Sequence, residues 1–202
     1  MNARLFLITL MSFSISKSNL LPQTRSEYFA SLEQLISKRD IEKKIAEAGQ
    51  QLNAVYAGKS VTIIMVMTGA VCVVSELMQA LDVPCKLKYI KASSYGSGMT
   101  SGDLTIVGLE DLNIEGEHIV LVDDIFDTGK TLTTLRTAIL EKNPASVKTL
   151  VLLTKNVNRP TDYQPDYTLF NIADHFVVGY GLDYKNHYRG LPGIYVLKNI
   201  PG

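Results

Sequence analysis

The stretch IVLVDDIFDTGKTL, residues 119–132, places acidic side chains directly beside a turn suited to phosphate. Its apolar run ends in Asp123 and Asp124, and Asp127 follows three residues later. The next segment, Thr128–Thr131, supplies two hydroxyls, a glycine for a tight turn, and the start of an expected helix. Free N–H groups and the positive dipole end at a helix N-terminus form a site for one compact phosphate.

Phosphate and carboxylate repel each other, so the acids are expected to contact another part of the ligand. Carboxylates accept hydrogen bonds from neighbouring sugar hydroxyls, or hold the hydration shell of Mg²⁺. A ligand with a phosphate at one end and ribose hydroxyls beside it satisfies both features. The alternative is that the acids only cap a helix and face solvent.

The commonest phosphate motif is absent. In the pattern G-x-x-x-x-G-K-[ST], the position of the first glycine is occupied by Asp124. No G-x-G-x-x-G follows a strand-like run either. The interpretation of this chain as a nucleoside triphosphatase therefore loses its main support.

Apolar strand-like runs alternate with helical patterns, which predicts an α/β fold with a mainly parallel sheet. Ligands bind at the carboxyl ends of such strands, so one edge is expected to hold Thr68, Asp123, Asp127, Lys155 and Asp183. The expected helices cover residues 37–56, 71–81 and 131–142. The expected strands cover residues 61–67, 85–93, 104–108, 118–124 and 147–154. Residues 175–183 are expected to form a strand that runs into a turn, and residues 193–198 a strand that closes the sheet.

Composition indicates an ordinary globular protein. Lysine plus arginine equals aspartate plus glutamate at 20 each, which argues against a general nucleic-acid coat protein. The only cysteines, Cys72 and Cys85, are expected to be reduced core residues, as in a cytosolic protein. Residues 1–25 are interpreted as a disordered leader or a mis-assigned start, with a poor signal peptide as the less favoured alternative. Residues 26–202 are expected to form a single domain.

The segment VLVDDIFDTGKTL resembles the signature of type I phosphoribosyltransferases, which bind 5-phosphoribosyl-1-pyrophosphate. The segments SSYGSG, LLTK, YQPDY and FVVGYGLDYKNHYRGLP narrow the resemblance to hypoxanthine-guanine phosphoribosyltransferases, from about residue 39 to residue 200. This resemblance implies a type I phosphoribosyltransferase fold with a small hood from the N- and C-terminal segments. It also implies transfer of a phosphoribosyl group to a 6-oxopurine in purine salvage, with Mg²⁺ as cofactor. The implied protein is a cytoplasmic homodimer or homotetramer whose partners are a purine base and phosphoribosyl pyrophosphate, not nucleic acid or membrane.

The resemblance also assigns the ribose-phosphate site. Asp123 and Asp124 are expected to hold the ribose hydroxyls and to contribute to the metal site. The 5′-phosphate loop would comprise Asp127, Thr128, Gly129, Lys130 and Thr131. Asp127 would also act as the catalytic residue near N7 of the purine, where a carboxylate can share a proton that becomes acidic during the reaction.

The purine pocket follows by the same resemblance. Lys155 would donate to the exocyclic 6-oxygen, which disfavours the amino group of adenine. Phe176 would stack on the ring, and Val177 would offer main-chain groups to its edge. Asp183 would belong to this pocket and also contact Mg²⁺.

Two further segments have expected roles. Thr68 and Gly69 correspond to the pyrophosphate loop, where many relatives have Lys or Arg at the Thr68 position and a cis peptide bond enters it. Arg189 would reach the pyrophosphate. Ser94 and Tyr95 begin a glycine-rich segment expected to close as a lid and exclude water.

Two alternatives stay open. A relative that prefers xanthine or guanine would share the same motifs. An RNA-binding regulator of pyrimidine genes with the same fold would need a basic face, which the balanced charge does not favour.

Overall fold

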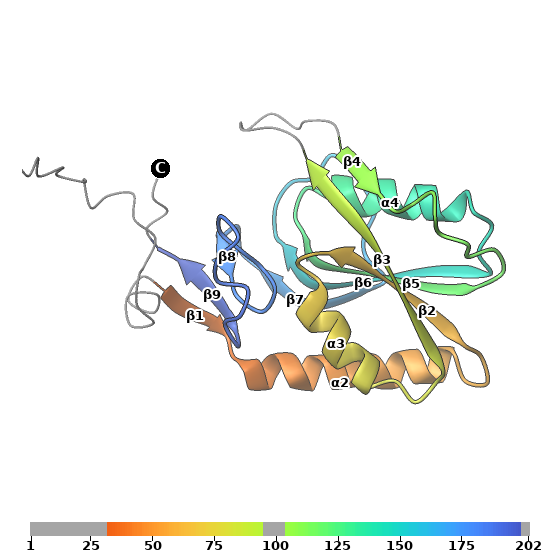
Figure 1. Ribbon diagram of the computed structural model, residues 1–202. Helices are drawn as coiled ribbons and strands as arrows, with labels where there is room; N and C mark the ends of the chain where they lie inside the picture. The colour runs from red at the N-terminus through yellow and green to blue at the C-terminus, as the bar shows by residue number, and fades with distance from the viewer. Residues whose placement is uncertain (1–31, 95–103, 199–202) are drawn as a thin grey trace, which may run out of the picture.

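The computed structural model describes residues 32–94 and 104–198. Its main sheet has six strands in the order β4-β3-β2-β5-β6-β7 (Figure 1), and only β4 runs antiparallel to its neighbour. The predicted mainly parallel α/β sheet is therefore confirmed. Its strands are β2 (Val61–Met67), β3 (Cys85–Ser94), β4 (Leu104–Val107), β5 (His118–Phe126), β6 (Ser146–Lys155) and β7 (Tyr167–Ile172).

Helices cover both faces of this sheet. Helices α2 (Lys38–Val55) and α3 (Val71–Gln79) lie on one face, and α4 (Lys130–Leu140) lies on the other (Figure 1). Helix α2 begins after Ser37, whose hydroxyl accepts a hydrogen bond from the Asp40 N–H and so satisfies a free donor of the first turn. Its buried residues recur at three- and four-residue steps, as expected for an amphipathic helix.

Strand β5 lies in the centre of the core. Val120 and Val122 pack into the cluster beneath α2 and α3, whereas Ile119 and Leu121 pack into the cluster beneath α4. Alternate side chains of a strand point to opposite faces, so a strand covered on both sides must be apolar throughout. This requirement explains the continuous apolar run that precedes Asp123.

A second, three-stranded antiparallel sheet forms the hood. It comprises β1 (Leu32–Ile36), β9 (Ile194–Leu197) and β8 (Val177–Val178), in the order β1-β9-β8. The expected hood from N- and C-terminal segments is confirmed. The expectation that residues 193–198 close the main sheet was wrong, because β9 pairs with β1 and β8. The edge strands of the main sheet are β4 and β7, and the sequence patterns did not identify β7.

Two predicted strand boundaries also differ. Residues 175–183 were expected to form a strand that runs into a turn, and the structure has this order, but with a strand of only two residues: Val177–Val178 forms β8, and Gly179 and Gly181 then adopt positive φ angles and turn the chain. Strand β5 continues to Phe126, so Asp123 and Asp124 lie within the strand and not at its end.

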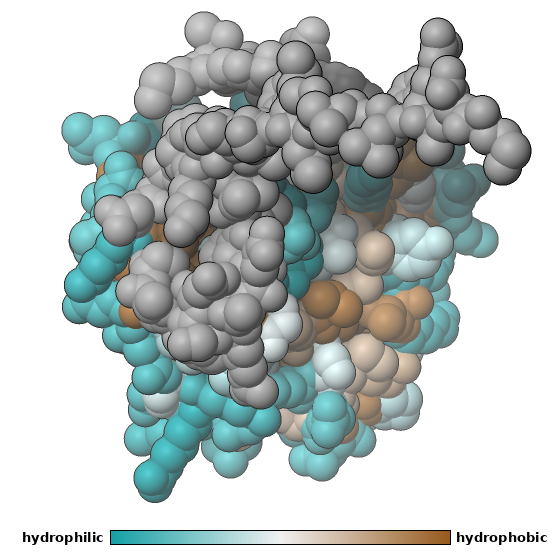
Figure 2. Space-filling model, turned by 60° about the vertical axis from the view of Figure 1, so that its left-hand side comes forward, coloured by the Kyte–Doolittle hydropathy of each residue, from teal (hydrophilic) through white to brown (hydrophobic). Residues whose placement is uncertain are grey.

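The face shown in Figure 2 is mostly hydrophilic among its coloured residues, with a small hydrophobic group near its middle. No helix in residues 32–94 and 104–198 is long and apolar enough to cross a membrane. Cys72 and Cys85 are free, as expected, but are only partly buried. The leader interpretation for residues 1–25 lies outside the described residues, as does most of the expected lid, including Tyr95.

Candidate active site

A cavity of about 270 Å³ opens where β2 and β5 diverge. The ladder between these two strands ends at the pair Met65 and Val122, although both strands continue. Strands β3 and β4 lie on one side of this pair, and β6 and β7 lie on the other. The strand order thus reverses between β2 and β5, which is where open α/β sheets bind ligands. The cavity is lined by Val66, Met67, Thr68, Gly69, Ala92, Asp123, Asp124, Ile125, Thr131, Asp183 and Arg189.

Asp123 and Asp124 share this cavity with Thr131, as predicted. Asp123 is only 6% exposed, and its Oδ1 accepts a hydrogen bond from the Asp124 N–H at 2.9 Å. Burial, and then the adjacent Asp124 charge, raise the pKa of Asp123 well above its ordinary value. Burial also raises the pKa of Asp124, although the positive charge of Arg189 opposes the shift. The pair therefore resists carrying two negative charges unless a ligand supplies donors or a cation.

The loop after β2 approaches Asp124 very closely. The peptide bond between Met67 and Thr68 is cis, as the resemblance predicted. A Cβ atom added to Gly69 would overlap the Asp124 carboxylate, so any larger residue there would have to displace that side chain. A Cβ added to Gly181 would in turn overlap the Gly69 carbonyl. Three separate segments thus meet at the floor of the cavity, and glycines at two of them permit the approach.

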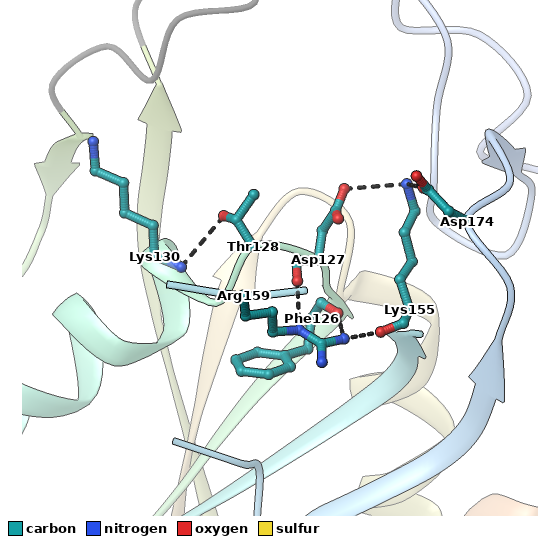
Figure 3. Close-up of polar contacts among 7 residues, drawn as sticks. All are labelled: Phe126, Asp127, Thr128, Lys130, Lys155, Arg159 and Asp174. Atoms are coloured by element: carbon teal, nitrogen blue, oxygen red, sulfur yellow. Dashed lines mark hydrogen bonds and ion pairs between the residues drawn. The ribbon is translucent and has the colours of Figure 1, made fainter. Parts of the chain in front are cut away.

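The predicted phosphate turn lies between β5 and α4. Gly129 occupies the N-cap position of α4 with φ of 82°, a left-handed conformation that favours glycine. The Thr128 hydroxyl accepts a hydrogen bond from the Lys130 N–H at 3.4 Å (Figure 3). Helix α4 begins at Lys130, one residue before the expected start. Thr131, in the first turn of α4, reaches the cavity, so the helix N-terminus is available to an anion there.

Lys155 and Asp127 lie together, as expected from the ends of neighbouring strands. The Lys155 ammonium is 3.1 Å from Asp127 Oδ2 and 2.9 Å from Asp174 Oδ1 (Figure 3), and its side chain is 13% exposed. Burial by itself would lower the pKa of Lys155, but the hydrogen bonds to Asp174 and Asp127 outweigh it and raise the pKa. Lys155 is therefore a charged donor held between two carboxylates.

Two other residues predicted to bind the purine, Phe176 and Val177, lie at and just before strand β8 of the hood. Phe176 is 40% exposed, with its ring edge-on to Tyr184 at 5.7 Å between centroids. An exposed aromatic face is available for stacking. Val177 is buried in β8 and pairs with Val196, so its side chain is a core residue. Neither Phe176 nor Val177 lines the cavity described above.

Asp183 and Arg189 enter the cavity from the turn after β8. Arg189 Nη2 lies 2.8 Å from Asp183 Oδ1, and Arg189 Nη1 donates to the Gly181 carbonyl at 2.7 Å. The Asn186 N–H donates to the other Asp183 oxygen at 2.7 Å. These contacts fix both charged groups in the lining of the cavity that also contains Asp123 and Asp124.

A metal would need oxygen ligands from both protein and substrate. No group of three or more His, Cys, Asp or Glu within the described ranges is arranged to hold a metal alone. Mg²⁺ is usually bound through one or two carboxylates together with substrate phosphates, and keeps several waters. Asp123, Asp124 and Asp183 line one cavity, and the first two gain from a nearby cation because their charges repel. This donor set fits Mg²⁺.

Three residues that contribute to the site were not identified from the sequence. Arg159 donates to main-chain carbonyls, Asp174 pairs with Lys155, and Gly181 packs on Gly69 in the loop after β2. Of these three residues, only Gly181 had a signal in the sequence, because the triplet GYG at residues 179–181 indicates a turn. Contacts to main-chain atoms leave no trace in side-chain patterns, so Arg159 had none.

Comparisons with known proteins agree with this geometry. Residues 31–185 match the phosphoribosyl transferase domain family. The chain is 40% identical over 165 residues to the hypoxanthine-guanine phosphoribosyltransferase of Streptococcus thermophilus, covering 81% of this chain and 92% of that protein.

Two solved structures are also similar. The hypoxanthine phosphoribosyltransferase of Staphylococcus aureus superposes with a TM-score of 0.80 at 32% identity, covering 87% of this chain and 97% of that one. The enzyme of the same name from Trypanosoma cruzi, in complex with the product IMP, superposes with a TM-score of 0.77 at 34% identity, covering 84% and 96%. The chain therefore belongs to the phosphoribosyl transferase family, and within it to the hypoxanthine-guanine phosphoribosyltransferases.

Proposed function

We propose that this protein transfers the 5-phosphoribosyl group of phosphoribosyl pyrophosphate to N9 of hypoxanthine or guanine. The products are IMP or GMP and pyrophosphate, so the reaction belongs to purine salvage. One observation carries the proposal: a single cavity at the switch point is lined by adjacent acids, the first turn of α4 and the loop after β2. A ribose carrying phosphate at one end and pyrophosphate at the other matches these three features.

Each end of the substrate has a complementary partner. The carboxylates of Asp123 and Asp124 accept hydrogen bonds from the 2′- and 3′-hydroxyls, and these donors offset the burial and the charge repulsion that raise the pKa of Asp123. The turn from Asp127 to Thr131 binds the 5′-phosphate through main-chain N–H groups and hydroxyls. Thr68 and Gly69 contact pyrophosphate mainly through the main chain, because Thr68 brings no cation, and Arg189 supplies positive charge.

Base recognition uses the Lys155–Asp127 pair. Lys155 donates to the 6-oxygen, whereas the amino group of adenine would place a donor against the ammonium. Phe176 stacks on the base, and the Val177 main chain contacts its edge. The bond from C1′ to pyrophosphate breaks as N9 bonds to C1′, and Asp127 accepts the proton that the purine loses, through N7.

Mg²⁺ belongs to the proposal as a cofactor. Asp183, with Asp123 and Asp124, would hold it against the substrate, and when bound it neutralises charge on the leaving pyrophosphate. The lid role of Ser94 and Tyr95, a homodimeric or homotetrameric assembly and a cytoplasmic location stay predictions. Light scattering of the purified protein tests the assembly.

The decisive experiment is a pyrophosphate-release assay with phosphoribosyl pyrophosphate and hypoxanthine, guanine, xanthine or adenine. We expect the highest kcat/KM values with hypoxanthine and guanine, and activity that is lost in EDTA and restored by Mg²⁺. A clear preference for xanthine would favour the alternative family member. Best activity with adenine would exclude Lys155 as the group that selects 6-oxopurines.

A further inference from the structure

Arg159 connects the ends of the two strands that carry the base-recognition pair. It lies in the connection between β6 and β7, four residues after Lys155. Its Nε donates to the Asp127 carbonyl at 2.6 Å, and its Nη2 donates to the Phe126 carbonyl at 3.3 Å and to the Lys155 carbonyl (Figure 3). The guanidinium also lies 4.8 Å from the centroid of the Phe126 ring.

These carbonyls lie where the sheet ends. The last paired residues of β5 and β6 are Phe126 and Thr154, so Asp127 has left the ladder between these strands. A guanidinium is planar, has five donors and is always charged, so it can bind several carbonyls at once. Within the sheet, main-chain hydrogen bonds hold neighbouring strands together. Just beyond the ends of β5 and β6, the Arg159 guanidinium holds the two chains together instead.

We propose that Arg159 is a positioning residue that fixes Asp127 relative to Lys155 for purine binding. This inference rests on the function proposed above, in which these two residues bind neighbouring positions of the base. N7 and the 6-oxygen of a purine lie on one edge. The two side chains that would read this edge are already 3.1 Å apart, and their main chains are held by the same guanidinium.

The Arg159 guanidinium also supports the predicted phosphate turn at Gly129. Its ring contact holds Phe126, and a Cβ added to Gly129 would lie 2.9 Å from Cζ of that ring. The turn is thus packed directly on the ring over which Arg159 lies. Loss of the guanidinium is expected to loosen Asp127 first and Gly129 second, because the Asp127 carbonyl is hydrogen-bonded to Arg159, whereas Gly129 is linked to it only through the Phe126 ring.

Arg159→Lys is the most informative variant. Lysine keeps the positive charge and most of the volume, but one ammonium cannot reproduce the planar fork. We expect kcat with hypoxanthine to fall by about tenfold or more, since a displacement on the order of 1 Å in an active site can cost about 10²-fold. We also expect the ratio of the Kd for AMP to the Kd for IMP, measured by calorimetry, to fall by about tenfold as Lys155 loses its fixed position.

A purely structural role predicts a different result. Partial unfolding would lower the active fraction, and this would change the measured stoichiometry but not the ratio of the two Kd values. Arg136→Lys is the matched control. The Arg136 guanidinium also lies over an aromatic ring, 5.1 Å from the centroid of Tyr163, but Arg136 belongs to α4, and Tyr163 lies in the connection between β6 and β7. This substitution should leave both kcat and the Kd ratio unchanged.

Chemical rescue gives a second, independent measurement. Millimolar methylguanidine should restore hypoxanthine turnover in Arg159→Ala, and should not increase turnover in Arg136→Lys. If the wild type is active but Arg159→Lys keeps the wild-type Kd ratio, and Arg159→Ala gains nothing from methylguanidine, the positioning role is refuted. If the wild-type protein releases no pyrophosphate with hypoxanthine, the proposed function fails and this inference fails with it.

Discussion

Replacement of Asp123 by asparagine should stabilise the ligand-free protein while weakening substrate binding. Asp123 is 6% exposed beside a second carboxylate, and both burial and that neighbour raise its pKa. Asparagine cannot ionise, yet its side-chain oxygen can still accept the hydrogen bond from the Asp124 N–H. The variant therefore keeps the local contact and removes the buried charge.

The pH dependence follows from the direction of the shift. A carboxyl whose pKa is raised in the folded state contributes stability below its ordinary pKa of about 3.9, and this contribution is lost as pH rises through the raised value. Each tenfold change in proton affinity corresponds to about 1.4 kcal/mol, or about 3–6 °C of Tm at this chain length. The Tm of Asp123→Asn should thus match the wild type near pH 4 and exceed it increasingly towards pH 8.

The assay is thermal unfolding in EDTA across this pH range. Asp166→Asn is a control for which the opposite pH dependence is expected, because the pKa of Asp166 is lowered and not raised. Burial would raise the pKa of Asp166, but hydrogen bonds from Lys148 and Thr149 outweigh it and lower the pKa. Its contribution to stability is present at neutral pH and is lost as pH falls through the lowered value. Asp166→Asn should therefore have a lower Tm than the wild type at pH 7, with the gap closing in acid.

Addition of ligand tests whether Asp123 contributes to substrate binding. Magnesium phosphoribosyl pyrophosphate should raise the Tm of the wild type, since a ligand that binds only the folded state stabilises it. The Tm of Asp123→Asn should rise much less. A Tm for Asp123→Asn below that of the wild type at pH 8 would show that the buried carboxylate is stabilising, and would refute the electrostatic account of the site.

Three other substitutions test separate parts of the site. Asp127→Asn should lower kcat by about 10²-fold or more, measured by pyrophosphate release, because proton transfer at N7 is lost; a wild-type rate would contradict that role. Lys155→Ala should reduce the preference for hypoxanthine over adenine by about 10- to 100-fold, since a charged hydrogen bond contributes about 1.5–3 kcal/mol. Gly69→Ala should raise the KM for phosphoribosyl pyrophosphate by about tenfold or more through displacement of Asp124, since an added Cβ overlaps that carboxylate. Gly190→Ala, where an added Cβ meets nothing within 4 Å, is its control, and equal KM values for the two variants would contradict the steric argument.

Much of the main sheet could be predicted from the sequence because its parallel strands are buried on both faces. Strand β2 was predicted with its observed bounds, since six of its seven residues are apolar, all except Thr62, and such a run is buried on both faces of a parallel sheet. Strand β7, with the sequence YTLFNI, was missed because it is a half-buried edge strand with mixed polarity. Strand β9 was assigned to the wrong sheet because its partners, β1 and β8, are separate segments of the chain and β8 has only two residues.

The acidic run and the turn after it were identified from the sequence alone, because strand, acids, glycine and helix start are consecutive in the chain and their local geometry is fixed by neighbours. The expected edge of the sheet brought several of the site residues together, but the tertiary structure decided the individual contacts between separate segments. It placed Gly69 against Asp124, Asp174 against Lys155, and Arg159 across the carbonyls of two strand ends. These contacts depend on sheet order and on main-chain atoms, which every residue has, so side-chain patterns along the chain do not encode them.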